Sequence, residues 1–379
     1  MRLAFDVTSC AKSRRGGIAG YGVNLIAAIA RLAPEHELVP CVRLARWRDR
    51  RLADDVVSGG KPRLLLDTLQ GLTLGGPVDL LHGIGVRLPK NGRFAKVVTV
   101  HDLNVFELPE LAPEAWRRRR SARLALTVAR ADAIIAYSEH GREALSEHLD
   151  VPRERVHVVP LGVDCARFRP HDDGRWLAAR DGLRARLALD DRPYVLALGV
   201  DLRRKNHTGL IAAFARAGLG TTHRLVIAGP SGERARQLAE HVARSDLRDD
   251  VVRLPGWVAD EDLPALVAGA ESYVCASLHE GFGLPVLEAQ ACGTPVVASD
   301  RAALPETLGG AGLAFDPDDR DALADCLIQV ARDGSLRADL RARGLRHVAS
   351  GFDWEDVARA TLAVYRAALE ARASDAPGS

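Results

Sequence analysis

Short apolar runs alternate with stretches of helical periodicity along almost the whole chain. In the first half the helical patterns include Tyr21–Leu32, Ala115–Arg130 and Gly141–Leu149. The apolar runs that predict strands are Leu3–Val7, Leu38–Val42, Asp79–His82, Val97–Val100, Ala133–Tyr137 and Val156–Val159. Because strands separated by helices form parallel sheets covered on both faces, this order predicts a doubly wound α/β fold.

The alternation stops over residues 160–193, which are rich in Pro, Asp, Arg and Gly, and then begins again. The later runs that predict strands are Tyr194–Gly199, Leu225–Ala228, Val251–Leu254, Tyr273–Ala276 and Pro295–Ser299. We therefore predict two Rossmann-like domains, 1–170 and 171–352, with a final helix at about 353–372 that packs back on the first. Ligands of doubly wound sheets bind beyond the carboxyl ends of the strands, so two facing domains predict a cleft between them.

Composition narrows the class of protein. Of the 379 residues, 47% are apolar and 27% are charged, as in a globular protein. No run approaches eighteen consecutive apolar residues, and the N-terminus lacks the apolar region of a signal peptide. The six cysteines are scattered without a C-x-x-C pair. This pattern predicts free thiols in the cytoplasm and argues against a zinc site.

Charge is distributed unevenly over a chain whose net charge is +2. Residues 1–160 carry +7 and residues 161–379 carry −5, which indicates different partners for the two halves. Almost all basic residues are arginine, and Lys205 is the only lysine after Lys96. Aromatic residues make up 5% of the chain and do not interleave with the arginines, so we expect no nucleic-acid partner.

The strongest chemical signal is a pair of glutamates, Glu280 and Glu288, around the sequence Gly-Phe-Gly-Leu-Pro. The segment follows a predicted strand and opens a predicted helix. Glycines allow the backbone to approach a ligand closely, and the free amides of Phe282, Gly283 and Leu284 favour oxygen atoms and negative charge. Glu288, about one helical turn further on, suits two hydrogen bonds to a ribose or sugar diol.

A basic segment, Arg203-Arg204-Lys205-Asn206, follows the strand that ends at Gly199. A lone lysine among arginines indicates a site that needs a compact ammonium group. Arg204 and Lys205 together are able to neutralise a diphosphate and stabilise it as a leaving group. The sequence leaves open whether Arg203 or Arg204 is the main arginine.

Residues 276–300 resemble the signature of the group 1 (family 4) retaining glycosyltransferases, which have the two-domain GT-B fold. Further matching segments begin at Gly16, Thr99, Ala136, Val158, Arg204 and Leu304. The resemblance implies that Arg204 and Lys205 hold the diphosphate of a nucleotide-sugar donor, helped by the amide of Gly17. It also implies that His101 contacts the transferred sugar and the acceptor hydroxyl. His82 is a second candidate for the acceptor side.

The resemblance implies front-face transfer of a hexose with retention of configuration, without a named nucleophile. Glu280 and the amides of residues 282–284 would hold sugar hydroxyls, and Glu288 the ribose. We expect mannose from GDP-mannose, a saccharide or lipid-linked acceptor, and a role in surface polysaccharide or lipopolysaccharide synthesis. The alternatives are a nucleotide-sugar epimerase or phosphorylase-like enzyme on the same fold, and a non-catalytic nucleotide-sugar-binding protein.

Two acidic segments, Asp316-Pro317-Asp318 and Asp260-Glu261-Asp262, are similar to the D-x-D metal motif of other glycosyltransferases. Both precede predicted helices, where aspartate commonly caps the helix start. We interpret them as caps. Cationic side chains already supply the charge that a diphosphate needs, so we expect no metal and no other cofactor.

A basic aromatic segment opens the helix predicted at Ala115–Arg130. It contains Trp116, Arg117, Arg118, Arg119, Arg120 and Arg123. Spacings of three and four place Trp116, Arg120 and Arg123 on one face of the helix. Such a face suits an anionic membrane surface, although a solvent-exposed helix is the alternative. We predict a cytoplasmic enzyme that docks peripherally on the inner face of the cell membrane.

Overall fold

The computed structural model describes residues 1–12, 16–57, 60–66, 74–170, 181–200, 203–245, 247–248 and 251–374. The chain divides into two compact units. The first comprises Met1–Gly162 together with the C-terminal segment from Trp354, and the second comprises Val163–Asp353. The first unit therefore ends eight residues before the boundary expected at 170. Val163 already belongs to the second unit, where it donates its N–H to the carbonyl of Phe352 at 2.9 Å.

The first unit is built on a seven-stranded sheet in the order β3-β2-β1-β4-β5-β6-β7, with parallel pairing throughout. Its strands are β1 (Arg2–Asp6), β2 (Glu37–Arg43), β3 (Arg63–Leu65), β4 (Leu80–Gly83), β5 (Ala95–Thr99), β6 (Ala133–Ala136) and β7 (Val156–Val158). The connecting elements are α1 (Gly17–Leu32), η1 (Leu44–Ala53), α3 (Asn104–Glu107), η2 (Pro109–Leu111), α4 (Glu114–Val128), α5 (Glu139–Leu149) and η3 (Arg153–Arg155).

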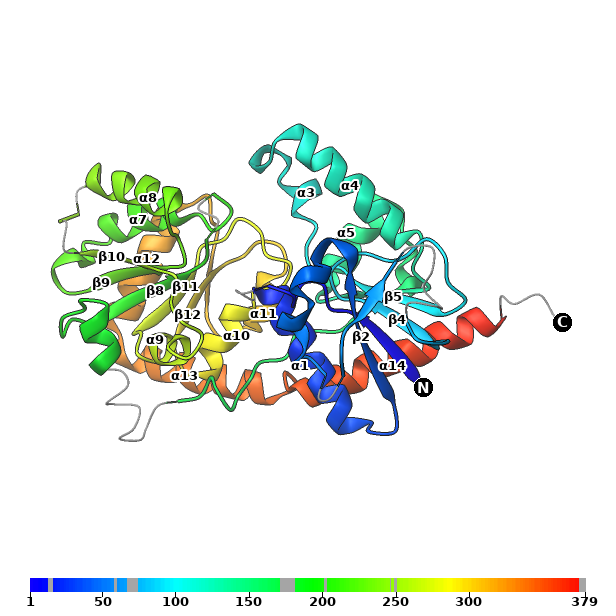
Figure 1. Ribbon diagram of the computed structural model, residues 1–379. Helices are drawn as coiled ribbons and strands as arrows, with labels where there is room; N and C mark the ends of the chain where they lie inside the picture. The colour runs from blue at the N-terminus through cyan, green and yellow to red at the C-terminus, as the bar shows by residue number, and fades with distance from the viewer. Residues whose placement is uncertain are drawn as a thin grey trace. The chain divides into compact units, whose positions relative to one another are not determined.

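Successive side chains of each strand point to opposite faces of the sheet, so the core of the first unit has two parts, one on each face. One set of strand residues, including Ala4, Val98 and Ile134, packs with α4 and α5 in a single apolar cluster. The opposite set includes Phe5, whose ring lies 6.4 Å from that of Tyr365 in α14 (Trp354–Ser374). Helix α14 packs on α1, β5 and β6, and Figure 1 shows it alongside α1. The last helix of the chain thus completes the core of the first unit.

The second unit has a six-stranded parallel sheet in the order β10-β9-β8-β11-β12-β13. Its strands are β8 (Tyr194–Leu198), β9 (Arg224–Ala228), β10 (Val252–Gly256), β11 (Ser272–Cys275), β12 (Val296–Ser299) and β13 (Leu313–Phe315). Its helices are α7 (His207–Arg216), η4 (Leu219–Thr221), α8 (Glu233–Ala243), α9 (Leu263–Ala268), α10 (Leu284–Ala291), α11 (Leu304–Leu308), α12 (Arg320–Arg332) and α13 (Gly334–Ala349).

The order of strands places the functional segments. In each unit the order reverses beside its first strand, between β1 and β4 and between β8 and β11. Doubly wound sheets bind ligands at this switch point, outside the carboxyl ends of the strands. In the second unit the two chain segments that leave this point are the basic loop after β8 and the glutamate loop after β11. Among helices in the described ranges, none is long and apolar enough to cross a bilayer.

Candidate active site

The basic loop after β8 is folded back on the strand that precedes it. Gly199 has φ +136°, and a Cβ atom there would lie 2.6 Å from Cε of Lys205, so only glycine leaves room for the lysine side chain. Asn206 has a left-handed conformation (φ +51°) at the start of α7, and its side-chain amide donates to the carbonyl of Pro317 at 3.3 Å. These contacts direct Arg204 and Lys205 to the switch point.

The glutamate loop after β11 is bonded directly to the basic loop. Leu278 donates its N–H to the carbonyl of Arg204 at 2.8 Å, and Nη1 of Arg204 donates to the carbonyl of His279 at 2.9 Å. The backbone N–H of Ala303 reaches the carbonyl of Glu280 at 3.3 Å. The two loops therefore fix each other before any ligand is present.

Arg204, Lys205 and Glu280 form a compact ionic cluster. Nζ of Lys205 lies 2.6 Å from Oε1 of Glu280, and Nη1 of Arg204 lies 2.8 Å from Oε2. Glu280 is buried, with 8% of its surface exposed. Burial by itself raises the pKa of a carboxyl group, but the charges of Lys205 and Arg204 lower the pKa of Glu280 to about 2. At neutral pH the cluster consists of two cations and one carboxylate. By contrast, Arg203 is exposed.

Helix α10 begins beside this cluster. Gly283 precedes its first residue with φ +94°, and a Cβ atom there would lie 2.6 Å from Cδ2 of Leu304. Phe282 is buried, and Thr307 donates its hydroxyl to the carbonyl of Phe282. The amides of the first turn of a helix have no intrahelical acceptors. In α10 Pro285 has no N–H and Val286 donates to the carbonyl of Gly283 at 2.8 Å, so Leu284 supplies the amide of this turn that suits an oxygen ligand.

Glu288 lies on α10 in surroundings unlike those of Glu280. Burial raises its pKa to about 7, because the opposing effects of the charges on Arg167 and Lys205 are smaller and the carboxyl group of Asp260 raises it further. Arg167 donates to the backbone carbonyl of Asp260 at 2.7 Å. Glu288 is thus partly protonated at neutral pH, and its side chain is half-buried.

The first unit carries the remaining predicted site residues. Helix α1 begins at Gly17, which is exposed. His101 follows β5, and Nε2 of its ring lies 2.6 Å from the carbonyl of Ile84 while Nδ1 lies 2.6 Å from the hydroxyl of Tyr137. A carbonyl only accepts, so Nε2 carries the hydrogen and Nδ1 accepts from Tyr137. Burial lowers the pKa of His101, which is therefore neutral.

The expectation that His82 lines the acceptor side is wrong. Its side chain is fully buried, and its ring nitrogens lie 2.6 Å from the hydroxyl of Tyr365 and 2.8 Å from that of Thr99. Burial lowers the pKa of His82 to about 3. The hydroxyl of Tyr21 continues this network at 3.0 Å from Thr99. His82 joins the sheet to α14 and has no surface to offer a ligand.

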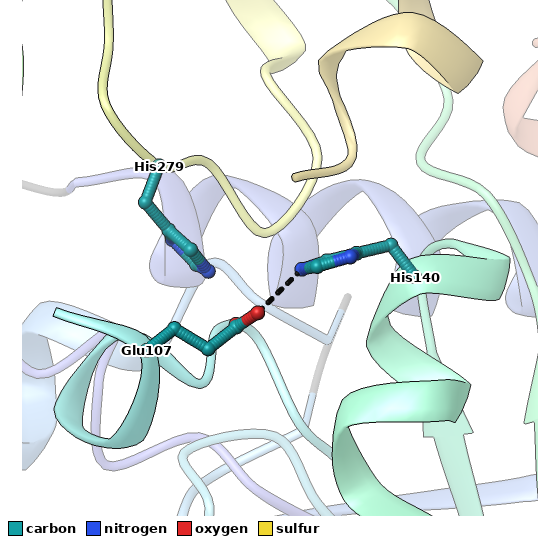
Figure 2. Close-up of side chains that lie close together, drawn as sticks. All are labelled: Glu107, His140 and His279. Carbon is teal, nitrogen blue, oxygen red and sulfur yellow. Dashed lines mark ion pairs between the residues drawn. The ribbon is translucent and has the colours of Figure 1, made fainter. Parts of the chain in front are cut away.

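An ion pair between His140 and Glu107 in the first unit was not predicted from the sequence. Nε2 of His140, in the first turn of α5, lies 2.8 Å from Oε1 of Glu107 at the end of α3, as Figure 2 shows. Both side chains are partly exposed at the carboxyl edge of the first sheet. Their separation in the sequence gives no signal of the pairing. His279, also drawn in Figure 2, belongs to the second unit.

The basic face of α4 has the predicted helical spacing. Cζ of Arg120 lies 5.7 Å from the centre of the Trp116 ring, and Trp116 is 49% exposed. Leu126, also on α4, is 57% exposed. Arg118 is engaged elsewhere, in an ion pair with Glu114. The charge of Arg87 lowers the pKa of Arg123, followed by burial and by the charges of Arg119 and Arg120, so several arginines crowd this face.

The aspartate segments do not act as the predicted caps. The carboxylates of Asp316 and Asp318 both pair with Nη2 of Arg301, at 2.6 and 2.8 Å. The next residue, Asp319, caps α12 by accepting from the amides of Asp321 and Ala322. Asp262 precedes α9 without a side-chain cap and pairs with Arg186 at 2.6 Å. Ion pairing with arginine takes precedence over capping at these positions because an arginine lies within reach of each carboxylate.

Both halves of the chain match glycosyltransferase families. Residues 180–347 match the family described as glycosyl transferases group 1, and residues 15–167 match Glycosyltransferase Family 4. O-antigen chain mannosyltransferase B of Escherichia coli is 34% identical over 289 residues, which cover 76% of this chain and 74% of that protein. D-inositol 3-phosphate glycosyltransferase 1 of Catenulispora acidiphila is 30% identical over 386 residues, covering 94% and 89%.

Among solved structures, sucrose-phosphate synthase from Thermosynechococcus elongatus superimposes with a TM-score of 0.76 and 23% identity, over 98% of this chain and 99% of that one. The two parallel doubly wound sheets and this likeness over the whole chain identify the fold as GT-B. The chain belongs to the group 1 (family 4) retaining glycosyltransferases, which transfer a sugar from a nucleotide-sugar donor.

Proposed function

We propose that this enzyme transfers mannose from GDP-mannose to a saccharide or lipid-linked saccharide acceptor, with retention of configuration. The observation that carries the proposal is the ionic cluster of Arg204, Lys205 and Glu280 at the switch point of the second sheet. Two cations against one carboxylate leave a net positive charge, which suits a diphosphate. The similarity to a mannosyltransferase of O-antigen chains supports mannose and surface polysaccharide synthesis.

In this proposal Arg204 and Lys205 bind the diphosphate, and the amide of Gly17 contributes a further hydrogen bond. Their charges stabilise the leaving group as the bond from the anomeric carbon to the phosphate oxygen breaks. The acceptor oxygen bonds to that carbon from the same face, and its proton passes to the departing phosphate oxygen. Because side-chain cations balance the diphosphate, the reaction needs no metal.

Glu280 and the amides at Phe282, Gly283 and Leu284 would bind hydroxyls of the donor sugar, and Glu288 the ribose diol. A carboxylate accepts hydrogen bonds from two hydroxyls at once, as a diol requires. His101 would contact the transferred sugar and the acceptor hydroxyl. Both nitrogens of its ring are already bonded, so a hydroxyl that binds through nitrogen has to replace Ile84 or Tyr137 as the partner.

The donor is identified by binding before turnover is sought. A ligand that binds only the folded state raises the unfolding temperature by mass action. We expect GDP to raise it more than UDP or ADP at equal concentration. Transfer is then measured with GDP-mannose and a saccharide acceptor. Stabilisation by UDP alone would mean that the donor carries uracil instead of guanine. Conversion of the donor without an acceptor-linked product would favour an epimerase, and no conversion at all with excess acceptor would favour a binding protein.

We also propose that the basic start of α4 docks on an anionic membrane, where a lipid-linked acceptor is found. Trp116, Arg120 and Arg123 share one face of the helix, and Arg117, Arg118 and Arg119 lie around the same turns. The exposed ring of Trp116 suits the headgroup region, and each basic residue near such a surface contributes about 1 kcal/mol. We expect sedimentation with anionic liposomes at low salt and release at high salt.

The matched control for docking removes the same number of arginines from another part of the chain, so that the two variants have equal net charge. Changing Arg117, Arg118, Arg119 and Arg120 to Ser should abolish sedimentation, whereas changing Arg234, Arg236, Arg244 and Arg248 of the second unit to Ser should leave it intact. Docking would be contradicted if the wild-type protein and both variants all remained in the supernatant at low salt. A soluble saccharide would then be the better acceptor.

A further inference from the structure

Ser277, which immediately follows Ala276 at the carboxyl end of β11, contacts Glu280 directly. Its side-chain oxygen lies 2.7 Å from Oε1 of Glu280, the same oxygen that Lys205 approaches at 2.6 Å. An ionised carboxylate only accepts hydrogen bonds, so the hydroxyl of Ser277 donates. Ser277 is almost completely buried, with 1% of its surface exposed. It supplies Glu280 with a neutral partner beside two charged ones.

Ser277 is itself held by the sheet. Its carbonyl accepts a hydrogen bond from the hydroxyl of Ser299, at the end of β12, at 2.6 Å. The sulfur of Cys275 lies 3.5 Å from the oxygen of Ser277. Because the hydrogen of the Ser277 hydroxyl is directed at Glu280, the thiol donates to that oxygen. The hydroxyl thus has one orientation, fixed by residues of two adjacent strands.

The other two partners of Glu280, Lys205 and Arg204, are also the residues expected to bind the donor. In the proposed function, on which this inference rests, Lys205 and Arg204 bind the diphosphate of the donor. Phosphate oxygens then draw both cations away from the carboxylate, because each cation has a limited number of donors to share. Ser277 is buried beneath the carboxylate and carries no charge, so its bond to Glu280 is unaffected by the diphosphate.

We propose that Ser277 is a positioning residue that keeps the carboxylate of Glu280 directed at the donor sugar after Arg204 and Lys205 have engaged the diphosphate. Side chains that hold a reactive or binding group contribute by fixing its geometry in the transition state. The sequence analysis did not single out Ser277, since a serine three residues before a glutamate has no distinctive meaning until the loop is folded.

The test is the Ser277→Ala variant, with Thr294→Val as the matched control. Thr294 is also a buried residue of the second unit, and its hydroxyl donates to the carbonyl of Val267 at 2.9 Å. We expect Ser277→Ala to lower kcat about tenfold or more, with less than a threefold change in the KM of the donor, because a hydrogen bond to a charged group is lost. The control should retain wild-type kcat at a similar loss of thermal stability.

A pH profile separates positioning from general damage to the fold. The hydroxyl of Ser277 helps to lower the pKa of Glu280, so its removal should move the acidic limb of kcat/KM for the donor to higher pH. Ser277→Thr, which keeps the hydroxyl, should restore both kcat and the limb. If that variant fails to fold, Ser277→Ala and its control decide the matter. An unchanged limb in Ser277→Ala, or a loss no larger than in Thr294→Val, would overturn the proposal.

A measurement without turnover distinguishes this proposal from the proposed function. The Glu280 carboxyl carbon is followed by NMR through an acid titration, with its signal assigned by comparison with Glu280→Gln. A wild-type protein that transfers no sugar defeats the proposed function. The proposal for Ser277 then stands if Ser277→Ala raises the pKa of Glu280, and falls if the two titrations coincide.

Discussion

The two units share the same strand order around their switch points, but the buried polar residue at the switch point is neutral in the first unit and ionised in the second. At the β1–β4 switch point of the first unit, His82 is buried among the hydroxyls of Thr99 and Tyr365, and burial keeps its ring neutral. At the β8–β11 switch point of the second, Glu280 is buried beside Lys205 and Arg204, and their charges keep it ionised. Both groups are buried, and the one whose partners are cations is ionised while the one whose partners are neutral hydroxyls is not.

The difference separates a structural network from a binding site. The partners of His82 are neutral groups that come from the sheet and α14, and no ligand needs to displace them. The partners of Glu280 are cations whose charge an anionic ligand competes for. The following predictions test this contrast, beginning with the largest expected effect.

Lys205→Ala should lower kcat by about 10²-fold or more, as the loss of one preorganised electrostatic group usually does. Arg204→Ala should have a comparable effect, because the same carboxylate pairs with both cations. Arg203→Ala is the matched control, since Arg203 is exposed one residue away and should change kcat little. Steady-state kinetics of the three variants checks this. A larger loss from Arg203→Ala than from Arg204→Ala would reverse the assignment of the two arginines.

Glu288→Ala should weaken nucleoside diphosphate binding by roughly 1.5–3 kcal/mol, the range for a hydrogen bond to a charged group. The affinity of the wild-type protein should also depend on pH. The pKa of Glu288 is about 7, so the carboxylate that accepts from the ribose diol forms as the pH rises through 7. Calorimetry should find tighter binding at pH 8 than at pH 6, and Glu288→Gln should remove that dependence. Unchanged affinity in Glu288→Ala would refute the ribose assignment.

His82 should make stability depend on pH although it takes no part in binding. Its pKa is about 3 in the folded protein and near 6.5 in an unfolded chain, so the unfolded state binds the proton first on acidification. Its stabilising contribution is complete above pH 6.5 and is lost as the pH falls towards 3, by up to about 1.4 kcal/mol per pH unit. His82→Gln should flatten acid unfolding between these values, measured by circular dichroism. His241→Asn, on α8, is the control and should leave the slope unchanged.

Metal removal should have the smallest effect. In the proposed function Lys205 and Arg204 supply the positive charge that a divalent ion would otherwise bring to the diphosphate, so kcat should be unchanged after exhaustive EDTA treatment. The comparison is made on one preparation before and after chelation, with manganese and magnesium added back separately. Activity that EDTA abolishes and manganese restores would mean that the cationic cluster is insufficient by itself.

Much of the fold was predictable because each strand of a parallel sheet is buried on both faces and reads as an apolar run. The ranges expected for β4, β8 and β11 agree with the structure to within one or two residues. The strands β3 and β13 were missed. Each has only three residues, as has β7, which was predicted because its apolar run continues through Val159.

The candidate site was only partly predictable. The sequence brought Arg204, Lys205 and Glu280 into consideration because each follows a predicted strand, and parallel strands end at one edge. The interpretation of His82 failed because its neighbour Tyr365 lies 283 residues away, and no local pattern indicates which face α14 covers. Arg301 and Asp316 are 15 residues apart, on loops after different strands, and no local pattern indicates that they pair. A buried hydroxyl such as that of Ser277 leaves no trace in a hydropathy pattern.

The return of α14 to the first unit has a consequence for how the protein is made. Residues 163–353 are a compact unit that is complete once Asp353 has been synthesised, whereas the core of the first unit lacks Tyr365 until α14 follows. Domains generally fold in order of synthesis. Here we expect the reverse: on the ribosome the second unit reaches its native state first, and the N-terminal sheet waits with its α14-facing side uncovered until the last helix emerges.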